Sequence, residues 1–244
     1  MALNALNLPY DKWGNGCAEA PIERVLAASL GKTLLFPGNI YDYRATDRVL
    51  TPTQRQDPET ARGAIRIRMA PQLAAAAERG DLQMLIVRAG NFYGSELPGD
   101  WFGELILREA KQHRVALNPA YFVKNAWAYL PDLAQALLIV AKQRSQFSAF
   151  ENFHFAGHLV TADETCSALE KAVPYQLKRV GYPWFLLKMM GGMPVIRGLV
   201  EMRYIWENEL GLHDPRLEAL LGSHFGMPFE VAIAHTAKRH FATG

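Results

Sequence analysis

The hydrophobic residues of this chain fall into short apolar runs separated by amphipathic stretches. Two runs, Thr33–Phe36 and Leu82–Val87, are typical of parallel strands that are covered on both faces. Amphipathic stretches at Cys17–Leu30 and Pro58–Arg79 predict a helix before each of them, and Leu3–Leu8 predicts a first short strand. The order strand, helix, strand, helix, strand predicts a parallel α/β sheet with crossover helices.

Further along, helices are predicted at Trp101–His113 and from Pro131 onward, and a strand at Asn152–Phe155. Pro58 is expected to open the second helix from its first turn, and Pro71 to kink that helix or divide it in two.

The residue composition and the pattern of predicted elements change after residue 157. Thr161 followed by Glu164 has the capping-box pattern of a helix start, and residues 182–206 combine proline, glycine and large apolar side chains. We therefore predict two parts, a parallel α/β domain at residues 1–157 and a mostly helical cap at residues 158–244.

Composition narrows the class of protein. The 244 residues are 50% hydrophobic, and 26 basic against 24 acidic residues give a net charge of +2 without long runs of one sign. This balance is typical of a soluble globular protein and predicts no binding to nucleic acid or membranes. No secretory leader is visible and Cys17 and Cys166 lie far apart, so we expect a cytoplasmic protein with two ordinary thiols and no disulfide.

Two similar turns are the best pointer to function. Gly38-Asn39-Ile40-Tyr41 and Gly90-Asn91-Phe92-Tyr93 each follow an apolar strand. Because the carboxyl ends of neighbouring parallel strands line one crevice, two amides and two phenols would gather there around a ligand. The alternative is that the asparagines only stabilise their own turns and the tyrosines only form amphipathic walls.

A series of segments, in this order and spacing, resembles the extended and atypical short-chain dehydrogenase/reductases, the NAD-dependent epimerase/dehydratase-like family. The segments that carry the resemblance are Asn4–Tyr10 with Trp13, Leu34–Tyr41, the helix after Pro58, Val87–Gly94, Ala128–Ala134 and, in the cap, Glu201–Glu207.

The resemblance implies a Rossmann-type sheet that binds NAD or NADP across its strand ends and a small polar, sugar-like substrate between sheet and cap. It assigns cofactor binding to Ala5, Asn7, Arg66, Gly90 and Asn91. Substrate contacts fall to Tyr93, Trp101 and Arg203. It also implies a homodimer formed through the helices at residues 17–30 and 58–79.

One departure from the family pattern concerns phosphate binding. The family begins with a strand and a Gly-x-x-Gly-x-x-Gly loop that binds the cofactor pyrophosphate. The first segment here already resembles the family's fourth strand, so we expect a partial Rossmann-type sheet without the family's first three strands and this loop. Weakened dinucleotide binding and an uncovered sheet edge would follow. A wrongly assigned start codon, a truncated gene and a minimal protein all fit this pattern.

A second departure concerns the proton donor. The positions of the family's Tyr-x-x-x-Lys pair hold Arg62 and Arg66, and arginine cannot donate a proton near neutral pH. We therefore predict a catalytic group of Tyr41, Arg62 and Arg66 in which Tyr41 is the acid, with Tyr93 and Tyr10 as the next candidates. The alternative for the arginines is a solvated helix face.

Other patterns are less specific. His154 and His158 are four residues apart, but the intervening glycine and the strand pattern argue against a metal site, and we predict none. Arg203 either contacts an anionic or hydroxylated substrate or pairs with Glu201 or Glu207 on the helix surface.

The sequence therefore predicts an NAD(P)-dependent epimerase, dehydratase or reductase with atypical catalytic residues, acting on a small-molecule substrate. The alternative is a non-catalytic Rossmann-like binding or regulatory module derived from such an enzyme.

Overall fold

The structure is a computed structural model. It describes residues 1–3, 25–95, 102–117, 122–181 and 200–242, together with Phe185, Met189 and Gly198.

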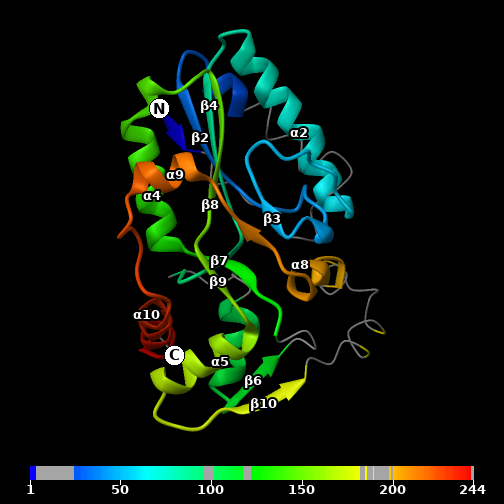
Figure 1. The fold of residues 1–244 in the computed structure, drawn as a ribbon, viewed down its shortest axis with the longest axis vertical. Coiled ribbons are helices and arrows are strands. Elements are labelled where there is room, and N and C mark those ends of the chain that lie inside the picture. Colours follow the sequence, from blue (N-terminus) through cyan, green and yellow to red (C-terminus); the bar gives the residue numbers. More distant parts are fainter. Residues whose placement is uncertain are drawn as a thin grey trace.

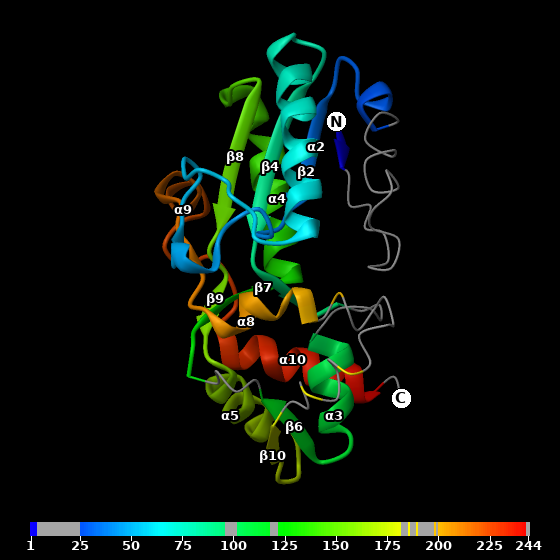
Figure 2. The same ribbon diagram turned by 90° about the vertical axis from the view of Figure 1, so that its right-hand side faces the viewer.

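A parallel four-stranded sheet forms the centre of the fold. Its strand order is β1 (Ala2–Leu3), β2 (Thr33–Gly38), β4 (Gln83–Ala89), β8 (Phe150–Phe155). Helix α2 (Ala61–Glu78) lies on one face and α4 (Leu130–Lys142) on the other (Figures 1 and 2). The predicted parallel α/β sheet with crossover helices is confirmed.

Alternating side chains of the strands enter two different cores. On β4, Met84 and Ile86 pack with α2 residues, whereas Leu85 and Val87 pack with α4 residues. Because both faces are covered, every position of this strand segment is buried, which explains the uninterrupted apolar run in the sequence.

Further elements complete the fold, and most of them lie beyond the carboxyl ends of the central strands (Figure 2). Before α4 these are η2 (Ala45–Asp47), β3 (Val49–Leu50), β5 (Asn91–Tyr93), η3 (Phe102–Leu107), α3 (Arg108–Ala110), β6 (Arg114–Leu117) and β7 (Asn125–Tyr129). After α4 they are η4 (Arg144–Gln146), β9 (His158–Val160), α5 (Ala162–Ala172), β10 (Lys178–Gly181), α8 (Arg203–Glu207), β11 (Gly211–Leu212), α9 (Pro215–Leu221) and α10 (Phe229–Ala242).

Elements from after residue 157 occur in both halves of the molecule. Strand β9 pairs with β7 and β11 pairs with β3, while α5 and α10 share the lower core in Figure 1. The proposed division at residue 157 stays a prediction.

Helix α2 corrects two predictions. It begins at Ala61 with Thr60 as N-cap, whose hydroxyl accepts a hydrogen bond from the Gly63 amide, so Pro58 lies outside the helix. Pro71 does not divide it: α2 is one helix from Ala61 to Glu78. Since Pro71 is exposed, water can satisfy the carbonyl that lost its amide donor.

The predicted helix Trp101–His113 is shorter and irregular. The structure has a π-helical segment η3 and one turn of α3, and then strand β6, which pairs with β10. The predicted start of α5 is confirmed, with Thr161 and Glu164 forming a reciprocal capping box.

A buried ion pair ties the strand ends together. Arg88 on β4 is 6% exposed and its Nη1 lies 2.7 Å from Oδ2 of Asp42, which is 1% exposed. The same Nη1 donates to the carbonyl of Asn39 at 2.9 Å, and Nε donates to Oδ1 of Asn152 at 2.9 Å. Burial raises the pKa of Asp42, and the Arg88 guanidinium opposes that rise.

His154 forms a second buried polar group on β8. Its Nδ1–H donates to the Leu50 carbonyl at 3.1 Å, so Nε2 accepts from the Tyr43 hydroxyl at 3.1 Å. Its backbone amide donates to Asp214, the N-cap of α9. Burial lowers the pKa of His154 from 6.5 to about 4, so the ring stays neutral at physiological pH.

We predict that Arg88→Met destabilises the fold by about 3–5 kcal/mol, because it leaves a buried carboxylate without its cation. Arg44→Met is the matched control, since Arg44 and Asp57 form an exposed pair whose loss should cost less than about 1 kcal/mol. Urea denaturation measures both. Equal effects would contradict the prediction, and Arg88→Met with Asp42→Leu should recover part of the loss.

We also predict that stability falls as pH drops from 6.5 toward 4, with about 3 kcal/mol of that fall due to His154. The unfolded imidazole takes up a proton in this window and the folded one does not, so protons favour the unfolded state. NMR titration of the histidine rings checks this directly. A His154 midpoint near 6.5 would refute the prediction.

Candidate functional site at the strand ends

The two Gly-Asn turns lie side by side, because β2 and β4 are neighbours in the sheet. Gly38 is in register with Arg88, so both turns leave the sheet at the same edge. A Cβ at Gly38 would lie 2.9 Å from Cγ of Arg88, and a Cβ at Gly90 would lie 2.1 Å from the carbonyl oxygen of Ala126. Both glycines are therefore needed for close packing at the strand ends.

The two asparagines have different surroundings. Oδ1 of Asn39 accepts the backbone N–H of Tyr41 at 3.3 Å, so this side chain stabilises its own turn. Asn91 is 7% exposed, and its Nδ2 is buried with no hydrogen-bond partner among the described residues. A buried amide without an acceptor costs roughly 1–3 kcal/mol, so Asn91 offers an unused donor at the end of β4.

Arg66 lies beside the first turn. Its guanidinium stacks over the Phe36 ring at 5.8 Å, and it lines a small cavity of about 20 Å³ together with Asn39, Asp42 and Arg88. The structure thus brings Arg66 to the strand ends where the sequence predicts the cofactor.

Arg62 is held by the C-terminal region of the chain. Its side chain is 7% exposed and forms an ion pair with Glu201, whose Oε1 also accepts the Arg62 backbone amide at 3.1 Å. A Cβ at Gly198 would lie 2.9 Å from Nη2 of Arg62, so the segment before α8 packs tightly on this guanidinium. The alternative of a solvated face therefore does not apply to Arg62.

Tyr41, the candidate acid, is half-buried between the first turn and α8. The Tyr204 hydroxyl donates to the Tyr41 carbonyl at 3.4 Å, and Gly63 of α2 packs against the same carbonyl. Burial raises the pKa of Tyr204, which keeps its phenol protonated. The role of Tyr41 as acid stays a prediction.

Tyr93 is fully buried. Its hydroxyl donates to Nδ1 of His158 at 2.8 Å, and its ring contacts Phe102, Tyr129 and Trp127. Burial raises the pKa of this phenol. These contacts agree with the reading of Tyr93 as a wall residue, and its predicted substrate contact stays a prediction.

Arg203 pairs with Glu207 one turn along α8, as one of the two sequence interpretations expected. Glu201, the other partner considered for Arg203, pairs with Arg62 instead. The predicted residues Ala5, Asn7, Tyr10 and Trp101 lie outside the described residues.

Three important residues were not predicted as part of the site: Asp42, Glu201 and Asn152. A sequence signal for the first existed, because Arg88 is a lone charge in an apolar strand and therefore requires a buried acidic partner. Nothing in the local sequence identifies which carboxylate that is.

The fold of this chain is similar to those of solved epimerases and dehydratases. The chain superposes on a presumed epimerase from Burkholderia cenocepacia J2315 with a TM-score of 0.75 and 15% identity, covering 98% of this chain and 75% of that one. UDP-glucuronic acid 4-epimerase from Bacillus cereus, solved with UDP-glucuronic acid and NAD, superposes with a TM-score of 0.75 and 9% sequence identity. The match covers 98% of this chain and 74% of that one. The dTDP-glucose 4,6-dehydratase DesIV from Streptomyces venezuelae, solved with NAD and TYD, superposes with a TM-score of 0.67 and 15% sequence identity. The match covers 93% of this chain and 65% of that one.

No protein-family model and no curated protein matches the sequence. At the level of fold, the predicted resemblance to epimerases and dehydratases is confirmed. No helix of the described segments is long and apolar enough to cross a membrane, and their His, Cys, Asp and Glu residues form no metal-binding group of three. The homodimer and the cytoplasmic location stay predictions.

We predict that Glu201→Gln lowers the free energy of unfolding by roughly 2–3 kcal/mol, because the buried Arg62 guanidinium loses its counter-charge. Glu207→Gln is the control, since its pair with Arg203 is more exposed and should contribute less than about 0.5 kcal/mol. Thermal and urea denaturation of both variants measure the difference. Equal stabilities would show that the Arg62 pair does not hold α8 in place.

Proposed function

We propose that this protein is an NAD(P)-dependent epimerase-, dehydratase- or reductase-like protein that takes a small polar, sugar-like substrate at the carboxyl ends of β2 and β4. One observation carries the proposal: the amide donor of Asn91 is buried at these strand ends without an acceptor among the described residues. A ligand oxygen would satisfy it. The solved neighbours that hold NAD and UDP-sugars support this ligand class by analogy of fold.

The residues at the strand ends fit the nicotinamide half of a dinucleotide. Gly38 and Gly90 let the backbone pack closely at the sheet edge, Asn91 supplies an amide donor, and Arg66 supplies a guanidinium beside the first turn. When bound, the nicotinamide would supply hydride transfer. By resemblance, Ala5 and Asn7 complete the cofactor contacts, and Tyr93, Trp101 and Arg203 those to substrate.

The proposed chemistry does not use the usual tyrosine and lysine. Arg62 is committed to Glu201, so its proposed role is to fix the cap over the site and to contribute positive charge. Arg66 would stabilise negative charge on a bound ligand, and Tyr41 would hold and transfer the proton.

A second candidate function is a binding module without turnover. The Arg62–Glu201 pair favours it, because the position that donates the proton in the family here holds a buried structural ion pair. A binding measurement tests whether the proposed site exists. A turnover measurement then distinguishes the enzyme from the binding module.

Binding is tested with Asn91→Leu and the matched control Asn125→Leu. Both asparagines are 7% exposed, but Nδ2 of Asn125 donates to the carbonyls of Lys124, Ile205 and Asn208. We expect Asn91→Leu to keep or raise stability and to weaken binding of NADH or a UDP-sugar about five- to tenfold, and Asn125→Leu to lose stability.

Calorimetric titration and urea denaturation measure the two effects. A stability loss in Asn91→Leu with unchanged ligand affinity would contradict the proposed site. Conversion of UDP-glucuronic acid or UDP-glucose in the presence of NAD, followed by chromatography, would support the enzyme. Saturable binding without any conversion would support the binding module.

A further inference from the structure

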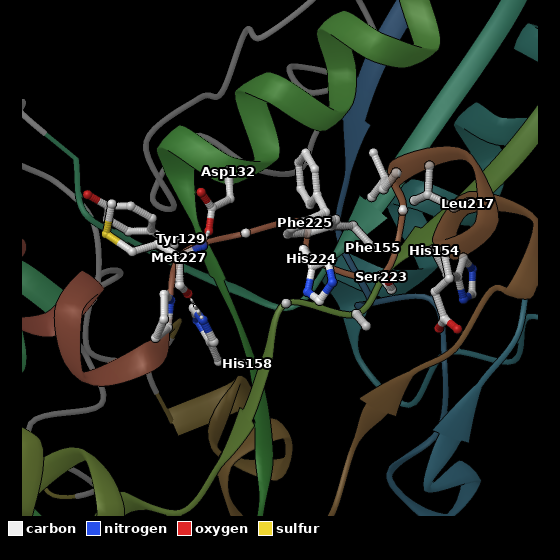
Figure 3. Close-up of a pocket in the computed structure, with 17 residues that line it drawn as sticks. Tyr129, Asp132, His154, Phe155, His158, Leu217, Ser223, His224, Phe225 and Met227 are labelled. Atoms are coloured by element: carbon white, nitrogen blue, oxygen red, sulfur yellow. Dashed lines mark hydrogen bonds between the residues drawn. The ribbon is translucent and has the colours of Figure 1, made fainter.

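A second cavity lies away from the candidate site. Its volume is about 640 Å³, within the range of small-molecule pockets, and it opens between the end of β8, the first turn of α4 and residues 217–228 (Figure 3). None of the candidate-site residues lines it. Neither the proposed function nor the predicted motifs account for it.

Hydrogen bonds hold the outer wall of this cavity in place. The Met227 amide donates to Oδ2 of Asp132 at 2.8 Å, and the Met227 carbonyl accepts from Nε2–H of His158 at 2.8 Å (Figure 3). The Phe225 ring packs edge-on against Phe155, with centroids 6.2 Å apart and planes at 90°. The loop from α9 to α10 is therefore tied at several points, and the cavity is preformed.

The lining combines apolar surface with negative charge. Phe155, Phe225 and Leu217 provide ring and aliphatic surface, and Asp132 and Glu218 provide carboxylates. The described lining contains no lysine or arginine, and the buried His154 is held neutral by its lowered pKa. A phosphate or carboxylate ligand would meet no lysine or arginine in the described lining, whereas a positive group would meet a carboxylate and aromatic rings.

We propose that this cavity binds a small organic cation with an apolar ring, such as an aromatic amine. The ring would lie against Phe155 and Phe225, and the ammonium group would face the carboxylate of Glu218. In the close-up, His224 projects between Asp132 and Phe155, where its ring can contact the same ligand (Figure 3). The site is independent of the dinucleotide site proposed above.

The test uses three indoles of similar shape and different charge: tryptamine, tryptophol and indole-3-acetate. Calorimetry of the whole chain at pH 7.5 and low salt should give tryptamine at least about tenfold higher affinity than tryptophol, and indole-3-acetate the lowest. Equal affinities for the three, or no binding of tryptamine up to about 5 mM, would overturn the proposal.

Two variants locate the binding. Glu218→Gln should weaken tryptamine about three- to tenfold and leave tryptophol unchanged, whereas Glu78→Gln, at an exposed carboxylate outside the cavity, should change neither. Ser223→Trp, on the exposed rim, should fill the cavity and weaken all binding at least about tenfold. Among the described residues, the Glu218 side chain pairs with His213 alone, and this pair is exposed, so the variant should fold. Tryptamine binding unchanged in Ser223→Trp would place the site elsewhere and refute the proposal.

Discussion

The buried Arg88–Asp42 ion pair is the interaction on which the candidate site depends. A guanidinium inside a parallel sheet is tolerated only if its charge and donors are satisfied, and here Asp42, the Asn39 carbonyl and Asn152 satisfy them. These partners come from the turn after β2, the loop beyond it and β8. One side chain therefore fixes how three neighbouring segments meet at the carboxyl ends of the strands.

The rigid arrangement gives the two similar turns different roles. Asn39 is occupied within its own turn, while Asn91 keeps a buried donor that has no acceptor in the part of the chain that the structure describes. Asn125 is equally buried, but its side-chain amide donates hydrogen bonds to three backbone carbonyls. The contrast supports the proposal that a ligand completes the second turn. The Arg62–Glu201 pair ties the start of α2 to the segment just before α8.

Local sequence patterns were sufficient to predict β2, β4, α4 and the capped start of α5, because each depends on its own periodicity or capping residues. Strands such as β3, β6 and β11 are short and form only by pairing with distant segments, so periodicity could not reveal them. Glu201 lies 139 positions from Arg62 in the sequence. No local signal shows that Glu201 pairs with Arg62 and not with the nearby Arg203. The hydrogen bond from the Tyr93 hydroxyl to His158 is likewise a tertiary contact that the local sequence does not reveal.

The most direct test of the account is the NMR signal of the Asn91 side-chain amide in uniformly ¹⁵N-labelled protein during titration with NADH and with UDP-glucuronic acid. Ligand binding at the strand ends predicts that this resonance shifts downfield in a saturable way, as expected when its donor gains an acceptor, while the Asn125 amide stays unchanged. Saturable binding that leaves the Asn91 amide unmoved would contradict the assignment of the site.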